Sequence, residues 1–330
     1  MRSCPCRLPP RRAACCAWVR LTGRCWNCCR CPTRCSRTSE RRGTGMCLIA
    51  FALDVHPDLP LLVAANRDEF FERPTAPLHR WTLPGGAPVV AGRDLRAGGT
   101  WLGVSASGRV AMLTNVRSSE TGDARRSRGE LASLWLGGGV ADTQALGDAV
   151  DPADFAGFNL VAGDLRQGDW RHLSNRNPAD PHSPHPPRLW QQRLEPGVHG
   201  VSNASLNTDW PKTRRLRSAV SRAVSEAADA GPGWQQVLHE ALGDGCAVPA
   251  AALPRTGVSD EWERALASPF VRMPGRGYGT RSSLIVQARR QDGALSLTLD
   301  EWRHESDGSA SAGPRWDAPV HRRETFDLPA

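Results

Sequence analysis

The sequence contains almost no lysine. Arginine supplies all but one of its 42 basic residues, and Lys212 is the single exception. This bias is typical of a GC-rich coding sequence and does not by itself indicate a binding role. The net charge of +8 is also unevenly placed, because residues 1–45 hold eleven arginines and one acid and so contribute +10. The remaining 285 residues sum to about −2, so they lack the basic surface that nucleic-acid binding needs, and we expect no nucleic-acid partner.

Cysteine is scarce after the first 45 residues. Nine of the eleven cysteines precede Met46, and only Cys47 and Cys246 follow it. Two cysteines so far apart show no disulfide framework, which is typical of a reducing compartment and predicts a cytoplasmic location. A run of about 18 apolar residues is also missing, so we expect no integral membrane segment. The arginine-rich N-terminus lacks the apolar core of a secretory signal.

Residues 1–45 allow two interpretations. Four of their cysteines have spacings found among zinc ligands: Cys25, Cys28, Cys31 and Cys35. Thiolates so spaced can close a tetrahedral zinc site. The irregular cysteine clusters and the lack of apolar periodicity instead predict a disordered Cys/Arg-rich extension upstream of the true start. We favour the second interpretation, with Met46 as the start, and we expect neither a metal site nor a cofactor.

From Met46 onward the pattern becomes that of a folded domain. Apolar runs of strand length are separated by glycine and proline turns. Strands are expected at 47–53, 61–65, 100–104, 109–113, 158–162, 170–173, 198–201, 284–288 and 295–302. Helices are expected at 130–136, 209–230, 234–242 and 260–266. Strands gather at both ends with helices between and after them, which predicts an α+β domain with antiparallel sheets over 46–315. The polar residues 316–330 are expected to form a frayed tail.

Cys47 is the strongest chemical candidate. It directly follows a possible initiator methionine and opens an apolar strand. Removal of the methionine would leave a thiol nucleophile and a free α-amine on one residue, and an α-amine with a pKa near 8 can act as a base. The alternative is a small buried hydrophobic residue, which is the usual state of a free cysteine.

Further polar motifs follow the strands. Asn66-Arg67-Asp68-Glu69 ends the second apolar run, where it could equally be a capped turn with an internal ion pair. Other blocks follow in order: GRD at 92–94, GGTWLG at 98–103, LTNVR at 113–117, SRGE at 127–130, GFNL at 157–160, GVSN at 200–203 and GTRSS at 279–283. Together these blocks resemble the NRDE family, whose members are similar to Transport and Golgi organisation protein 2. The resemblance runs from Met46 to about Ala288.

That family in turn resembles N-terminal-nucleophile hydrolases of the cholylglycine hydrolase and penicillin V acylase type. The resemblance implies a four-layer αββα sandwich and a set of site residues: Cys47, Arg67, Asp68, Asn115, Asn203 and Arg281. Cys47 would attack a carbonyl while Asp68 holds the α-amine and Arg67 lowers the pKa of the thiol. Asn115 and Asn203 would donate to the oxyanion. Arg281 would support Asp68 or the asparagines.

Two functions remain open at this stage. The first is an N-terminal-cysteine amidohydrolase that acts on a non-peptide C–N amide bond of a small molecule. The alternative, implied by the resemblance alone, is a non-catalytic haem- or lipid-handling protein connected with trafficking and Golgi organisation. A saturable Soret shift on titration with haem would favour the second, since a hydrolase has no need to bind haem.

Overall fold

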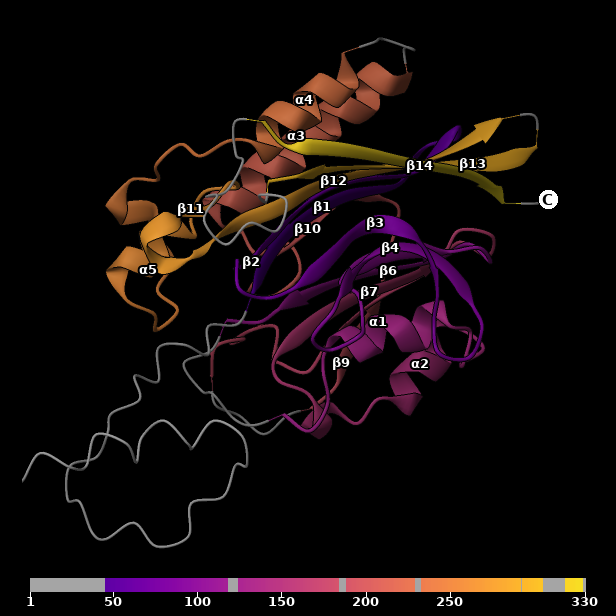
Figure 1. The fold of residues 1–330 in the computed structure, drawn as a ribbon, viewed down its shortest axis with the longest axis horizontal. Coiled ribbons are helices and arrows are strands. Elements are labelled where there is room, and N and C mark those ends of the chain that lie inside the picture. Colours follow the sequence, from indigo (N-terminus) through magenta and orange to yellow (C-terminus); the bar gives the residue numbers. More distant parts are fainter. Residues whose placement is uncertain are drawn as a thin grey trace, which may run out of the picture. The chain divides into compact units, whose positions relative to one another are not determined.

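Two antiparallel β-sheets lie face to face between two layers of helices (Figure 1). The computed structural model describes residues 45–117, 124–183, 188–228, 233–291, 293–304 and 318–328, which belong to one unit, Thr44–Ala330. The expected Cys/Arg-rich extension and its zinc-ligand alternative fall on residues outside this description. None of the described helices combines the length and the apolar content that crossing a bilayer would require.

The first sheet carries the candidate nucleophile on a central strand. Its order is β10-β1-β2-β12-β13-β14, with β11 paired to β12. The strands are β1 (Met46–His56), β2 (Leu59–Phe70), β10 (Gly197–Val201), β11 (Arg272–Met273), β12 (Tyr278–Gln291), β13 (Ala294–Arg303) and β14 (Val320–Leu328). Because β1 and β2 are buried on both faces, they are continuous apolar runs without polar alternation.

The second sheet follows the chain without a crossover. Its order is β3-β4-β5-β6-β7-β8-β9. The strands are β3 (Thr75–Thr82), β4 (Pro88–Asp94), β5 (Leu102–Ser105), β6 (Arg109–Asn115), β7 (Phe158–Asp164), β8 (Asp169–Ser174) and β9 (Trp190–Arg193). Each neighbouring pair is antiparallel, as in a meander, and the long connection between β6 and β7 carries α1, α2 and η2.

The helices cover the outer faces of both sheets (Figure 1). The α-helices are α1 (Gly129–Leu136), α2 (Thr143–Ala149), α3 (Pro211–Ala228), α4 (Trp234–Leu242) and α5 (Asp260–Ala265). Short 3-10 helices are η2 (Pro152–Asp154), η3 (Ala250–Ala252) and η4 (Pro274–Arg276). Helix α3 begins at Pro211, two residues later than the sequence predicts, because proline lacks an N–H group and is favoured at the first helical position.

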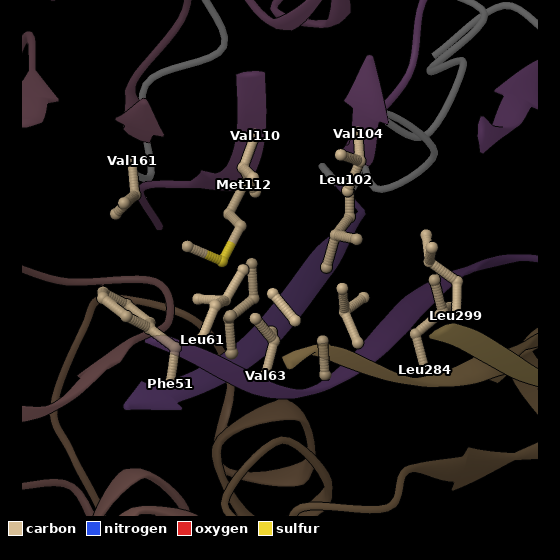
Figure 2. Packing of buried hydrophobic residues seen from close by; sticks show 14 of the residues in the cluster. Phe51, Leu61, Val63, Leu102, Val104, Val110, Met112, Val161, Leu284 and Leu299 are labelled. Atoms are coloured by element: carbon tan, nitrogen blue, oxygen red, sulfur yellow. The ribbon is translucent and has the colours of Figure 1, made fainter. Parts of the chain in front are cut away.

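Three apolar clusters hold the four layers together. One fills the space between the sheets, where Val110 and Met112 point towards Phe51, Leu61 and Val63 (Figure 2). A second packs α3 and α4 on the sheet that contains β1, and a third packs α1 and α2 on the other sheet. The expected α+β fold, a four-layer αββα sandwich with antiparallel sheets, is therefore confirmed.

The end of the domain differs from the sequence prediction. Residues 316–330 were expected to fray, but 320–328 form β14, which pairs with β13 from Leu295↔Leu328 to Arg303↔Val320. Most of its side chains are exposed, and only Leu328 is buried. An edge strand of this kind has little apolar pattern, and its backbone pairing stabilises it instead. The domain thus continues past residue 315.

Candidate active site

Cys47 lies at the beginning of β1, where the strand reaches the end of the inter-sheet cluster. Its thiol is buried, with 7% of the residue exposed, and it shares a face with Ile49 and Phe51. This follows from the two-residue period of a strand. Its neighbour across the ladder on β2 is Arg67. The Cys47 carbonyl accepts a hydrogen bond from the Ser202 hydroxyl at 2.8 Å, so the end of β10 fixes this end of β1.

Burial dominates the ionisation of the thiol. It raises the pKa of Cys47 to about 12, although the Arg67 charge and the Asp68 backbone N–H lower it. The Arg67 charge lowers the pKa of the Cys47 thiol, as expected, but the net shift is upward. The guanidinium acts in the predicted direction, but the loss of hydration outweighs it. A thiol that stays neutral near pH 7 needs a base before it can act as a nucleophile.

The tetrad at the end of β2 alternates between the two faces of its sheet. Asn66 points towards α4, where its Nδ2 donates to the carbonyls of Leu242 at 2.8 Å and Pro269 at 2.9 Å. Ser283 Oγ donates to its Oδ1 at 2.6 Å. Asn66 therefore ties α4 to the sheet. On the opposite face Glu69 lies 3.7 Å from the Arg67 guanidinium, while Arg67 Nη1 has no hydrogen-bond partner among the described residues.

Asp68 faces the residue that precedes Cys47. Its register partner on β1 is Met46, and residues so paired have Cα atoms about 4.5–5.5 Å apart. Its Oδ1 accepts from Thr280 Oγ1 at 2.7 Å, and within the described residues its Oδ2 has no partner. Burial raises the pKa of Asp68 to about 6, opposed by the Lys212 charge and the Thr280 hydrogen bond. One carboxylate oxygen of Asp68 therefore lacks a hydrogen bond within the described part of the chain, on the strand position that pairs with Met46.

Two asparagines meet at the same end of the sheets. Asn203 Nδ2 donates to the Asn115 carbonyl at 3.0 Å, and the Asn203 carbonyl accepts from the Arg117 backbone N–H at 2.8 Å. Asn115 Nδ2 donates to the carbonyl oxygen of Gly45, two residues ahead of Cys47. The Asn115 amide thus already holds a carbonyl oxygen close to the start of β1.

Arg281 lies near the start of β12 and bonds to the backbone that follows β2. It falls at an irregularity between Thr280 and Ser282, where the register of β12 against β2 shifts. Its Nη1 donates to the backbone carbonyls of Phe70, at 3.0 Å, and Arg73. These bonds hold the turn after β2. The support of Asp68 or of the asparagines by Arg281 stays a prediction.

Several residues around Cys47 have no signal in the sequence motifs. The Tyr278 hydroxyl accepts a hydrogen bond from the Met46 backbone N–H at 3.1 Å. Lys212 is fully buried, and its Nζ lies 3.2 Å from Asn203 Oδ1. Burial lowers the pKa of Lys212 to about 7, with Arg117 acting in the same direction and Asp68 against it. A solitary lysine in an arginine-rich chain was the one available hint, and composition alone gave it no role.

The site therefore combines a buried cysteine at a strand end with an arginine, an aspartate and two asparagines from neighbouring strands. The described residues hold no group of three or more His, Cys, Asp or Glu side chains that could bind a metal ion. By its fold and this site, the protein is an αββα sandwich protein in which polar side chains surround a buried cysteine. The site residues come from three strand ends and from the loop that follows β10.

The chain belongs to the Transport and Golgi organisation 2 family, whose family model matches residues 46–298. It is 33% identical to the human Transport and Golgi organization protein 2 homolog over 271 residues, which cover 77% of this chain and 92% of that protein. The Bos taurus homolog is 31% identical over 295 residues, covering 84% and 98%. The Drosophila melanogaster protein is 37% identical over 81 residues, covering 22% and 28%.

Among solved structures, a conjugated bile acid hydrolase of Clostridium perfringens aligns with 84% of this chain and 97% of its own. The TM-score is 0.40 and the sequence identity 9%. A TM-score of this size supports no inference about chemistry.

Proposed function

We propose that this protein, once the residues ahead of Cys47 are removed, is an N-terminal-cysteine amidohydrolase acting on a non-peptide C–N amide bond. The observation that carries the proposal is Asp68 Oδ2, a buried carboxylate oxygen with no hydrogen-bond partner among the described residues, on the residue that pairs with Met46 just ahead of Cys47. A buried carboxylate with an unsatisfied oxygen costs free energy. An α-ammonium or α-amine on Cys47 would supply the missing donor.

In the acylation step, Cys47 supplies both the nucleophile and the base. The Cys47 thiol passes its proton to its own α-amine as Sγ bonds to the amide carbon. The carbonyl oxygen becomes an oxyanion that accepts from the Nδ2 groups of Asn115 and Asn203. The α-ammonium then gives its proton to the amide nitrogen, the C–N bond breaks, and an amine leaves a thioester on Cys47.

Deacylation reverses these roles with water. The α-amine takes a proton from a water molecule whose oxygen attacks the thioester carbon. The C–S bond breaks, the sulfur recovers a proton, and a carboxylic acid leaves. The Arg67 charge facing Cys47 lowers the free energy of the departing thiolate, which is a useful function even though the resting thiol is neutral.

The processed chain also differs from the full chain in access to the site. With Gly45 and Met46 in place, the Asn115 amide is bonded to the Gly45 carbonyl and the Met46 N–H to Tyr278. Both contacts vanish when these two residues are removed. We accordingly propose Met46 as the translation start, with residues 1–45 outside the mature protein.

Turnover on a panel of acyl p-nitroanilides of different chain lengths tests this function. Protein that begins at Cys47 is expected to release p-nitroaniline in a burst and to gain the acyl mass on the Cys47 peptide. The absence of both adduct and turnover across the panel would contradict the proposal, as would acylation that falls equally on the exposed Cys246.

The remaining assignments stay predictions. A cytoplasmic location agrees with two free thiols, Cys47 and Cys246, in the described chain. The non-catalytic haem- or lipid-handling alternative, with a trafficking or Golgi-organising role, has no supporting contact among the described residues. The Soret titration described above tests it.

A further inference from the structure

Lys212 occupies a place in the fold that disfavours a cation. It is 1% exposed and follows Pro211 in the first turn of α3. The N-terminus of a helix carries partial positive charge, so a lysine there is repelled by the backbone as well as deprived of water. A residue kept at such a site at a cost in stability often serves the chemistry next to it.

Its contacts converge on one atom of the candidate oxyanion site. Lys212 Nζ donates to Asn203 Oδ1 at 3.2 Å, and Ser202 Oγ lies 3.0 Å from the same oxygen, although its one hydrogen also serves the Cys47 carbonyl at 2.8 Å. Its Nζ also lies 5.8 Å from the centre of the Trp210 ring. The ammonium at Oδ1 and the Asn115 carbonyl at Nδ2 fix which end of the Asn203 amide is oxygen, because the flipped amide would set N–H groups against the ammonium and its oxygen against the carbonyl.

The fixed oxygen determines where the nitrogen points. Asn203 Nδ2 then lies towards the Asn115 carbonyl, which takes one of its two hydrogens at 3.0 Å. Within the described segments no second acceptor bonds to Nδ2, which leaves its other hydrogen for the substrate oxyanion. An oxyanion-hole donor is effective when it is oriented before the reaction, since no free energy is then spent on turning it in the transition state.

We propose that Lys212 is a positioning residue that locks the Asn203 carboxamide in the orientation that donates to the substrate oxyanion, an inference that rests on the proposed acyl-transfer function. The charged groups around its ammonium come from every neighbouring element. Asp68 on β2 and Glu263 on α5 favour the charged form, as does ionised Cys47 on β1, while Arg117 after β6 opposes it. Because the pKa of Lys212 is lowered, its ammonium loses a proton as the pH rises past neutrality. Its hydrogen bond to Asn203 Oδ1 then weakens.

A comparison of two reactions of Cys47 separates positioning from a structural role. Acylation by a p-nitroanilide forms an oxyanion, whereas alkylation by iodoacetamide forms none. In Lys212→Met we expect the acylation rate to fall about 10- to 100-fold, within the range for loss of one oxyanion donor. Alkylation should stay within about twofold, and Lys212→Arg should recover part of the acylation rate. Arg214→Met, an exposed cation two residues along α3, is the matched control and should change neither rate.

A double-mutant cycle identifies the atom through which Lys212 acts. If Lys212 works through Asn203, the Lys212→Met/Asn203→Ala protein should acylate no more slowly than Asn203→Ala alone. Additive losses, a parallel fall in acylation and alkylation, or unchanged acylation in a folded Lys212→Met protein would each overturn the proposal.

A spectroscopic readout keeps this test separate from that of the proposed function. If unaltered protein acylates no substrate, the amidohydrolase proposal fails. The Asn203 side-chain ¹H–¹⁵N pair, identified by its loss in Asn203→Ser, still reports on the lock. We expect two distinct, slowly exchanging hydrogens that exchange faster in Lys212→Met. The same shifts and exchange rates in both proteins would overturn the positioning role.

Discussion

Replacing Cys47 by serine is expected to lower amide turnover by at least about 10³-fold while the protein stays folded. A hydroxyl is a far weaker nucleophile than a thiol transferring its proton to an adjacent amine, and the buried pocket adds no new base. The substitution keeps the side-chain shape, so the contacts of β1 with β2 and β10 should persist. Steady-state release of p-nitroaniline and the urea midpoint of unfolding measure the two effects.

The matched control for this substitution is Cys246→Ser. Cys246 is the other described free thiol, but it is exposed and far along the chain from the site residues. Its replacement should leave turnover within about twofold. Full activity in the Cys47→Ser protein, or an equal loss in both variants, would remove the nucleophile from the account.

Replacing Asp68 by asparagine is expected to lower kcat/KM by about 10²- to 10⁴-fold, the range for a carboxylate that orients a catalytic base. It should also change the pH profile. In the unaltered protein the α-amine must be neutral to accept the thiol proton, so activity falls below its pKa. Burial raises the pKa of Asp68 to about 6, so the fall should steepen below that pH, as the carboxylate also becomes protonated.

The sign of the shift in Asp68→Asn follows from charge. A carboxylate beside an ammonium stabilises the ammonium and raises its pKa, so its loss should move the acid limb of kcat/KM to lower pH. The additional steepening below pH 6 should disappear. Asp300→Asn is the control, because Asp300 is a buried carboxylate on β13 that binds Arg323 and His321 away from the site. A profile in Asp68→Asn that overlays that of the unaltered protein would contradict the role of Asp68.

The apolar patterns predicted the inner strands well and the outer strands poorly. The runs at 47–53 and 61–65 became the centres of β1 and β2, because a strand buried on both faces is apolar throughout. Strands β4, β9 and β11 were also missed, although β4 has four buried residues. Strands β3 and β14 were missed because most of their side chains face solvent or are half-buried. Backbone pairing with β4 and β13 defines them, and that pairing leaves little trace in residue type.

The sequence predicted which residues form much of the site, but not how the fold changes their ionisation. The motifs led to Cys47, Arg67, Asp68 and Asn115, which lie at strand ends, to Asn203 in the loop after β10, and to Arg281, which bonds to the carbonyl of Phe70. The net ionisation of the Cys47 thiol depended on how completely the fold removes water from it, which no motif encodes. The position of Lys212 likewise arises where α3 begins against β2 and the loop after β10, so that its contacts join segments distant in sequence.

The intact mass of the natively expressed protein tests the central claim most directly. If Cys47 is an amino-terminal nucleophile, the mass should correspond to a chain that starts at Cys47, without Met46 or anything before it. A mature protein that retains residues ahead of Cys47 has no α-amine at this position, and the mechanism proposed for the site would then be excluded.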